Sequence, residues 1–160
     1  EIYIVINGGE LLSFIALIKV LGLIVLSTTT NSALVFFLVS LFSTNSSFGT
    51  ASTVIGTLIG FLTGVYLPIG QLPEAVQYII KVFPPSHSAS LFRQVMMADP
   101  IAVTFAGAPA EYLTPFYDQM GITISFGSTT LPAWANILVL IGSAVIFYCL
   151  ALINISRKKV

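Results

Sequence analysis

Few residues of the chain belong to the types that catalyse reactions or bind metals. The 160 residues include one histidine, His87, and one cysteine, Cys149. A lone cysteine forms no disulfide within the chain, and no pair of residues shows the spacing of metal ligands. The phosphate-binding pattern G-x-x-x-x-G-K-[ST] is absent, because no glycine is followed by a lysine. We therefore expect no catalytic residue, no metal and no cofactor, and no ATP bound through such a loop.

A cluster of uncharged polar residues, from 27 to 32, interrupts an apolar stretch. Hydroxyl groups in a helix bond back to a carbonyl of the preceding turn, or to a neighbouring helix. This structural interpretation is preferred. In the alternative, Thr29, Thr30 and Asn31 line a path for a substrate. Asn31 is then the stronger candidate, because an amide is harder to satisfy within its own helix.

The composition indicates what surrounds the chain. Charged residues make up 8% of it and hydrophobic residues 56%, whereas a soluble domain carries about a quarter charged residues. This number of charges is too small to cover a surface that faces water. The surface is therefore expected to face lipid. The formal net charge of zero gives no indication of a nucleic-acid partner. The predicted fold is an all-α, multi-pass helix bundle in a lipid bilayer.

Three segments are predicted to cross the bilayer, which takes roughly 20 apolar residues per helix. They lie at about residues 20–42, 50–67 and 131–155. The first contains the polar cluster, and two short helices joined by a turn at that cluster are the alternative. One helix is preferred, because the second short helix would have only about ten residues, roughly half a span.

Basic residues predict the orientation. Arg157, Lys158 and Lys159 lie together near the C-terminus, and such groups stay on the cytoplasmic side of a membrane. Counting back through the three spans places the stretch at about 98–130 outside the cell, and this stretch contains no lysine or arginine. Lys19, which falls on the outer side, disagrees with the rule. We expect a multi-pass protein of the cell membrane with a cytoplasmic C-terminus.

Small residues recur at every fourth position of the second predicted span. Ser52, Gly56, Gly60 and Gly64 would lie close to one face of a helix, where small side chains let another helix approach. Packing within the same chain is the preferred interpretation, and a contact between two copies is the alternative.

Prolines divide the segment that follows this span. Pro68 ends the span, Pro73 starts an amphipathic helix, and Pro84 ends that helix before a second short one. We expect these two helices, at about 74–97, to lie along the outer interface as a cap over the exit of a cavity. Within the cap, His87 and Arg93 are assigned to packing or to headgroup contacts, with gating or substrate binding as the alternative.

The same segment resembles the C-terminal half of an ABC-2 type permease, the membrane subunit of one class of ABC exporters. The resemblance rests on the run from Gly64 through V-Y-L-P-I-G-Q to Leu72 and Pro73, the amphipathic helix, Pro84, and Leu91-Phe92-Arg93. The loop S-L-F-S-T-N-S-S-F-G-T-A-S, between the first two spans, also looks like the loop of that family. The resemblance covers about residues 10–97.

The resemblance implies a transport subunit rather than an enzyme. It implies a separate ATP-binding cassette ATPase and a second permease copy, in a homo- or heterodimer, as partners. The three spans would be the fourth, fifth and sixth helices of such a subunit. The first residues, Glu1–Gly8, would end the third helix, so we expect the chain to lack an N-terminal part.

Two other functions remain open. One is a membrane anchoring or assembly protein without a transport role, and the other is an ion-coupled carrier. A carrier requires an acidic residue inside a span, whereas all six acidic residues lie outside the predicted spans.

Overall fold

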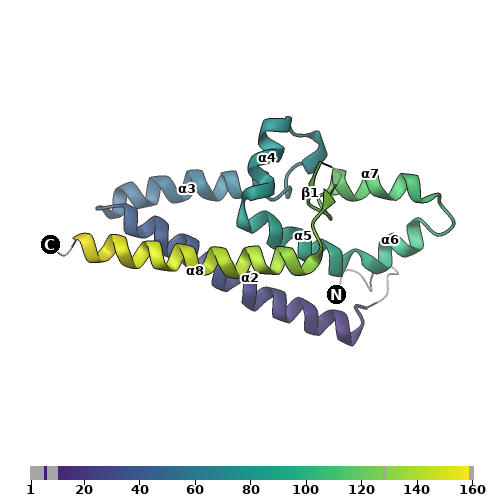
Figure 1. Ribbon diagram of the computed structural model, residues 1–160, viewed down its shortest axis with the longest axis horizontal. Coiled ribbons are helices and arrows are strands. Elements are labelled where there is room, and N and C mark those ends of the chain that lie inside the picture. Colours follow the sequence, from purple (N-terminus) through teal and green to yellow (C-terminus); the bar gives the residue numbers. More distant parts are fainter. Residues whose placement is uncertain (1–5, 7–10, 128, 159–160) are drawn as a thin grey trace.

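The computed structural model describes residue 6, residues 11–127 and residues 129–158. Within these ranges the fold is a bundle of α-helices with one short hairpin, which confirms the all-α prediction (Figure 1). The segment Glu1–Gly8, where a further helix was expected to end, lies outside the described residues apart from Ile6. The elements are α2 (Phe14–Leu41), α3 (Asn45–Leu62), η1 (Ile69–Gln71), α4 (Glu74–Val82), α5 (Pro84–Met96), α6 (Ala98–Thr104), α7 (Ala110–Met120), β1 (Ser125–Phe126), β2 (Thr129–Thr130) and α8 (Ala133–Lys158).

Helices α2 and α8 form the long axis of the molecule and pack against each other (Figure 1). In the described part of the chain, these are the two helices long and apolar enough to cross a bilayer. Few residues along either helix are buried, unlike those of a core helix in a soluble protein. Their lengths of 28 and 26 residues correspond to about 42 and 39 Å at 1.5 Å per residue, more than the hydrocarbon thickness of about 30 Å.

Helix α2 runs without a break through the polar cluster, so the alternative of two short helices does not describe this segment. It begins at Phe14, earlier than residue 20, and the Ser13 side chain caps it by accepting from the Ala16 N–H at 3.2 Å. Thr29 donates to the Val25 carbonyl at 2.8 Å, and Thr30 donates to the Leu26 carbonyl at 3.0 Å. These bonds satisfy the hydroxyl groups inside the helix, which is why the cluster does not end it.

Polar contacts hold α8 against α2 at two heights. Near the middle of α2, the Thr30 hydroxyl shares its one hydrogen between the Leu26 carbonyl and the Leu140 carbonyl of α8, the latter at 3.2 Å. Near the C-terminal ends of both helices, the Asn154 amide donates to the backbone and side-chain oxygens of Ser40, at 2.6 and 3.1 Å. Leu140 and Asn154 are 14 residues apart, about 21 Å along the helix. These bonds fix the register of the two helices between Thr30 and Ser40 of α2 and between Leu140 and Asn154 of α8.

Helix α3 differs from the span predicted at about 50–67. It begins at Asn45, after a Thr44 cap, and ends at Leu62. The reason for the early end is a turn at Gly64, whose φ of +70° lies in the left-handed region. None of its residues is buried. Its 18 residues measure about 27 Å, so that α3 crosses the bilayer stays a prediction.

Helix α5 packs between α2 and α8, near the N-terminal ends of both. Seven of its thirteen residues are buried, so α5 is part of the bundle; that the segment at about 74–97 lies at the outer interface stays a prediction. Pro84 and Pro85 occupy its first positions, where a missing N–H costs nothing. The preceding helix α4 is more superficial, with exposed Tyr78, Ile79 and Val82.

The stretch from residue 98 to 130 lies at the opposite end of the molecule from the C-terminus (Figure 1). It contains α6, α7 and a hairpin in which Ser125 pairs with Thr130 and Phe126 with Thr129. Helix α7 ends at Gly121, in the left-handed conformation with φ of +65°. The turn that follows α7 returns to the bundle and contacts α5.

Candidate functional site

Helix α5 donates hydrogen bonds to carbonyl groups at the ends of three other helices. The last carbonyls of any helix lack partners within it. The Ser86 hydroxyl donates to the Leu62 carbonyl, at the end of α3, at 2.9 Å. The Ser90 hydroxyl donates to the Ile122 carbonyl, just after α7, at 2.7 Å. These small polar side chains therefore bind helix ends that hydrocarbon could not satisfy.

His87 connects α5 to α4 and α8. It is 2% exposed, with Nε2 3.0 Å from the Lys81 carbonyl near the end of α4 and Nδ1 2.7 Å from Oδ1 of Asn136 in α8. A carbonyl only accepts, so Nε2 carries a hydrogen, and an uncharged ring then accepts at Nδ1.

The Asn136 amide can be oriented to match this requirement. Its Nδ2 is buried without a partner among the described residues, and exchanging the amide oxygen and nitrogen would place an N–H against Nδ1 of His87. We assign that orientation, because it replaces a contact between two acceptors by a hydrogen bond; the amide oxygen is then the buried atom without a partner among the described residues. The pair then joins α5 to α8 by a hydrogen bond between two buried side chains.

Arg93 binds the ends of α3 and α7 at once. Its guanidinium donates to the Thr63 and Gly64 carbonyls, at 2.8 and 2.9 Å, and to the Gly121 carbonyl at 3.4 Å. Carbonyl groups at a helix C-terminus carry partial negative charge, which favours a cation there. Burial lowers the pKa of Arg93 from its usual value, although an arginine keeps its charge in proteins.

Two glycines make room for the Arg93 side chain. A Cβ atom at Gly64 would lie 3.3 Å from one guanidinium nitrogen and 2.8 Å from the Ile69 side chain. One at Gly121 would lie 3.3 Å from the other nitrogen. Both glycines have a positive φ, which other residues adopt only with strain. Gly64 therefore acts in the turn after α3, and its prediction as part of a helix face is wrong.

The other small residues of that predicted face have different surroundings. A Cβ at Gly60 would collide with the ring of Tyr66, which folds back from the turn after α3. Apart from the neighbouring backbone of its own helix, no described atom lies within 4 Å of a Cβ built at Gly56. Ser52 is half-buried. Packing of another helix on Ser52 and Gly56 stays a prediction.

The three residues predicted to line a path do not point the same way. Thr30 is 0% exposed and bonds to α8, as the structural interpretation of the cluster requires. Thr29 is exposed and, with Tyr148 and Cys149, lines a groove of about 630 Å³ between α2 and α8. Asn31 is exposed in a shallower groove along α2. A role of Thr29 and Asn31 in a substrate path stays a prediction.

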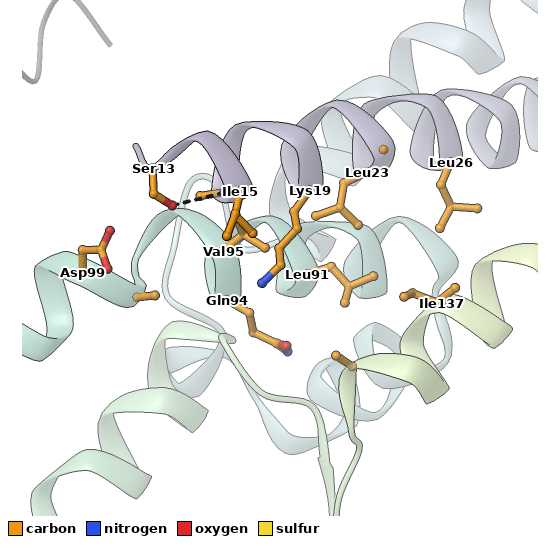
Figure 2. Close-up of a pocket in the computed structure, with 14 residues that line it drawn as sticks. Ser13, Ile15, Lys19, Leu23, Leu26, Leu91, Gln94, Val95, Asp99 and Ile137 are labelled. Carbon is orange, nitrogen blue, oxygen red and sulfur yellow. Dashed lines mark hydrogen bonds between the residues drawn. The ribbon is translucent and has the colours of Figure 1, made fainter. Parts of the chain in front are cut away.

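A larger cavity, of about 700 Å³, lies between the N-terminal parts of α2 and α8, the C-terminal half of α5 and the start of α6 (Figure 2). Sequence reasoning did not find it, although Lys19, a cation in an apolar region, was a signal for it. The predicted cap prolines do not line it: Pro68 precedes η1, Pro73 precedes α4 and Pro84 starts α5. The prolines therefore set where the helices begin.

The fold and these contacts define an all-α membrane bundle in which one buried polar helix joins the ends of its neighbours. The chain is similar to Nodulation protein J of Rhizobium meliloti (strain 1021), with 27% identity over 88 residues, which are 55% of this chain and 34% of that protein. It is also similar to Nodulation protein J of Rhizobium leguminosarum bv. viciae, with 42% identity over 50 residues, which are 31% of this chain and 19% of that protein. The matched part is thus about a third of the first relative's length, and less of the second's. No family model and no solved structure matches the chain.

Proposed function

We propose that the chain is part of the membrane-spanning permease subunit of an ATP-binding cassette exporter of the ABC-2 type. Its place would be the cell membrane, crossed several times, with the C-terminus in the cytoplasm. The observation that carries the proposal is the proline-divided segment that leads from α3 through α4 into the buried helix α5. This is the segment on which the resemblance to ABC-2 permeases rests, and the similarity to Nodulation protein J supports the same family.

The proposed mechanism involves no chemistry on the substrate. A separate ATPase would bind on the cytoplasmic side, and its ATP binding would shift two permease copies relative to each other. The substrate would pass between the copies. Thr29 and Asn31 are exposed on α2 and would be available to such a path, whereas Thr30 would hold α2 to α8. Helix α3, which has no buried residue, would pack against segments or copies that the structure does not contain.

The position of the acidic residues disfavours an ion-coupled carrier. The four acidic residues of the described ranges, Glu74, Asp99, Glu111 and Asp118, lie in α4, α6 and α7. Helices α2, α3 and α8 therefore contain no carboxylate to bind a coupling proton or cation within the bilayer.

The test is whether the intact subunit recruits and regulates an ATPase. The intact subunit should co-purify with an ATP-binding cassette ATPase encoded beside it, and reconstitution in vesicles should change the turnover of that ATPase. A matched variant of the subunit, Asn31→Leu, should keep the ATPase bound but reduce transport. If the subunit neither recruits an ATPase nor alters its turnover, the proposal fails and a membrane anchoring role becomes the better explanation.

A further inference from the structure

The cavity between α2, α5 and α8 carries two opposite charges that do not neutralise each other. Lys19 of α2 and Asp99 of α6 both line it, and no ion pair joins them. In Figure 2 the Lys19 amine points into the cavity, while the Asp99 carboxylate lies at one end of it. Gln94 also lines the cavity. Its Nε2 donates to Ser90 and to the Ile122 carbonyl, which leaves its Oε1 as an acceptor.

Polarity changes in one direction along the cavity. Ser13 and Asp99 lie at the end that contains the start of α2, and Lys19 follows about 9 Å further along that helix. Leu23 and Leu26 follow about 6 and 10 Å beyond Lys19. Beyond Lys19 the wall is completed by Leu91 and Ile137, whereas Ile15 and Val95 lie between Asp99 and Lys19 (Figure 2). The charged groups along the wall therefore come in the order anion, then cation, and the wall beyond the cation is hydrocarbon.

We propose that this cavity binds one phospholipid with a phosphoethanolamine headgroup, in the leaflet on the side away from Arg157. The lipid ammonium would donate to the Asp99 carboxylate, and the phosphate would accept from Lys19. The acyl chains would lie against Leu23, Leu26 and Leu91. The order of groups along such a lipid, ammonium, phosphate and then hydrocarbon, is the order of complementary groups along the cavity.

The same charges disfavour other occupants. An anionic headgroup would meet Lys19 but would also lie close to the Asp99 carboxylate, which repels it. A choline headgroup has no N–H with which to donate to that carboxylate. An apolar transmembrane helix would leave both charged groups of the cavity without a partner in a region that excludes water. The site requires only that the chain is in a membrane, so it does not depend on the proposed export function.

The experiment measures lipid binding to the intact subunit after removal of its endogenous lipid. Native mass spectrometry during titration with phosphatidylethanolamine, phosphatidylglycerol or phosphatidylcholine gives three affinities for each variant. Lys19→Met keeps the aliphatic stem but removes the charge, and Asp99→Asn removes the carboxylate charge. Lys81→Met is the matched control, because Lys81 is a lysine of α4 that does not line the cavity.

The two variants should have opposite effects on the anionic lipid. Lys19→Met should weaken the binding of phosphatidylethanolamine and of phosphatidylglycerol, each about tenfold, because both carry a phosphate. Asp99→Asn should weaken phosphatidylethanolamine about tenfold while it strengthens phosphatidylglycerol. Lys81→Met should change neither. Soluble glycerophosphoethanolamine, which lacks acyl chains, should not compete at the same concentration.

Three results would overturn the proposal. If all variants bind all three lipids with equal affinity, the lipid is bound only nonspecifically around the surface of the protein. Tighter binding of phosphatidylglycerol than of phosphatidylethanolamine by the unchanged protein would show that Asp99 does not contact the headgroup. Competition by glycerophosphoethanolamine equal to that by the lipid would show a site for the headgroup alone. If the unchanged subunit binds the lipid as expected but recruits no ATPase, the lipid site stands and the proposed export function fails.

Discussion

Helices α3 and α5, which η1 and α4 separate in the sequence, are held in place in different ways. Helix α5 has seven buried residues and donates hydrogen bonds to the ends of α3, α4 and α7. Helix α3 has no buried residue, and its polar contacts to other elements are at its C-terminal end. The comparison indicates that the polar side chains of α5, rather than apolar packing, position this end of the bundle. Since hydrocarbon offers no competing partners, such bonds persist where water would exchange with them.

The largest effect is expected at Arg93. Arg93→Gln would leave the Thr63, Gly64 and Gly121 carbonyls without their donor, and unfolding in a detergent titration should become easier by about 3 kcal/mol. Arg93→Lys should recover only part of this, because an ammonium cannot reproduce the planar guanidinium. The control Lys81→Gln should be close to neutral. An Arg93→Gln protein as stable as the control would show that α5 does not fix the two helix ends.

A smaller loss is expected when Gly121 is replaced. Gly121→Ala adds a Cβ that collides with Ile69 in a backbone conformation that disfavours alanine, and should cost about 2 kcal/mol. Gly107→Ala is the matched control. Gly107 also has a positive φ, of +80°, but apart from its chain neighbours no described atom lies within 4 Å of the added Cβ. It should cost about 1 kcal/mol. Thermal melting of the two variants side by side gives the difference, and equal losses would show that the contact with Ile69 is unimportant.

A loss of about 0.6 kcal/mol is expected for Thr30→Val. This change removes the hydrogen bond to Leu140 in α8 while it keeps the shape of the side chain. Thr29→Val removes only a bond within α2 and should be neutral. Detergent unfolding of the pair measures the strength of the bond between α2 and α8. If Thr29→Val is the more harmful change, this side of α2 must contact something else.

The smallest effect on stability, and the clearest effect on transport, is expected for Asn31→Leu. Asn31 is exposed, and its side chain makes no hydrogen bond to the described residues, so its replacement should leave the amount and melting temperature of the subunit unchanged. If it lines the substrate path, export into vesicles should fall severalfold. An unchanged export rate would remove Asn31 from the path.

Local patterns in the sequence predicted the helical class and the segments in which the helices lie, because both depend on apolar length and on proline. They did not predict the burial of α5. Ser86, His87 and Ser90 look like surface residues, and their partners are backbone carbonyls that carry no signature in the sequence. The role of Gly64 was also missed, because a spacing of four residues matches a helix face equally well. The cavity at Lys19 joins three helices that are distant in sequence, which no local pattern records.

The contacts of Arg93 also determine when the chain can finish folding. The carbonyls of Thr63 and Gly64 are made about 30 residues before the side chain that binds them, and Gly121 follows 28 residues later still. At a synthesis rate of 5–20 residues per second, the end of α3 therefore waits for several seconds without its final partners. Over that interval α3 and its turn are substrates for membrane chaperones and proteases. A nascent chain that stops before Gly121 should accordingly be degraded faster than one that extends a few residues beyond it.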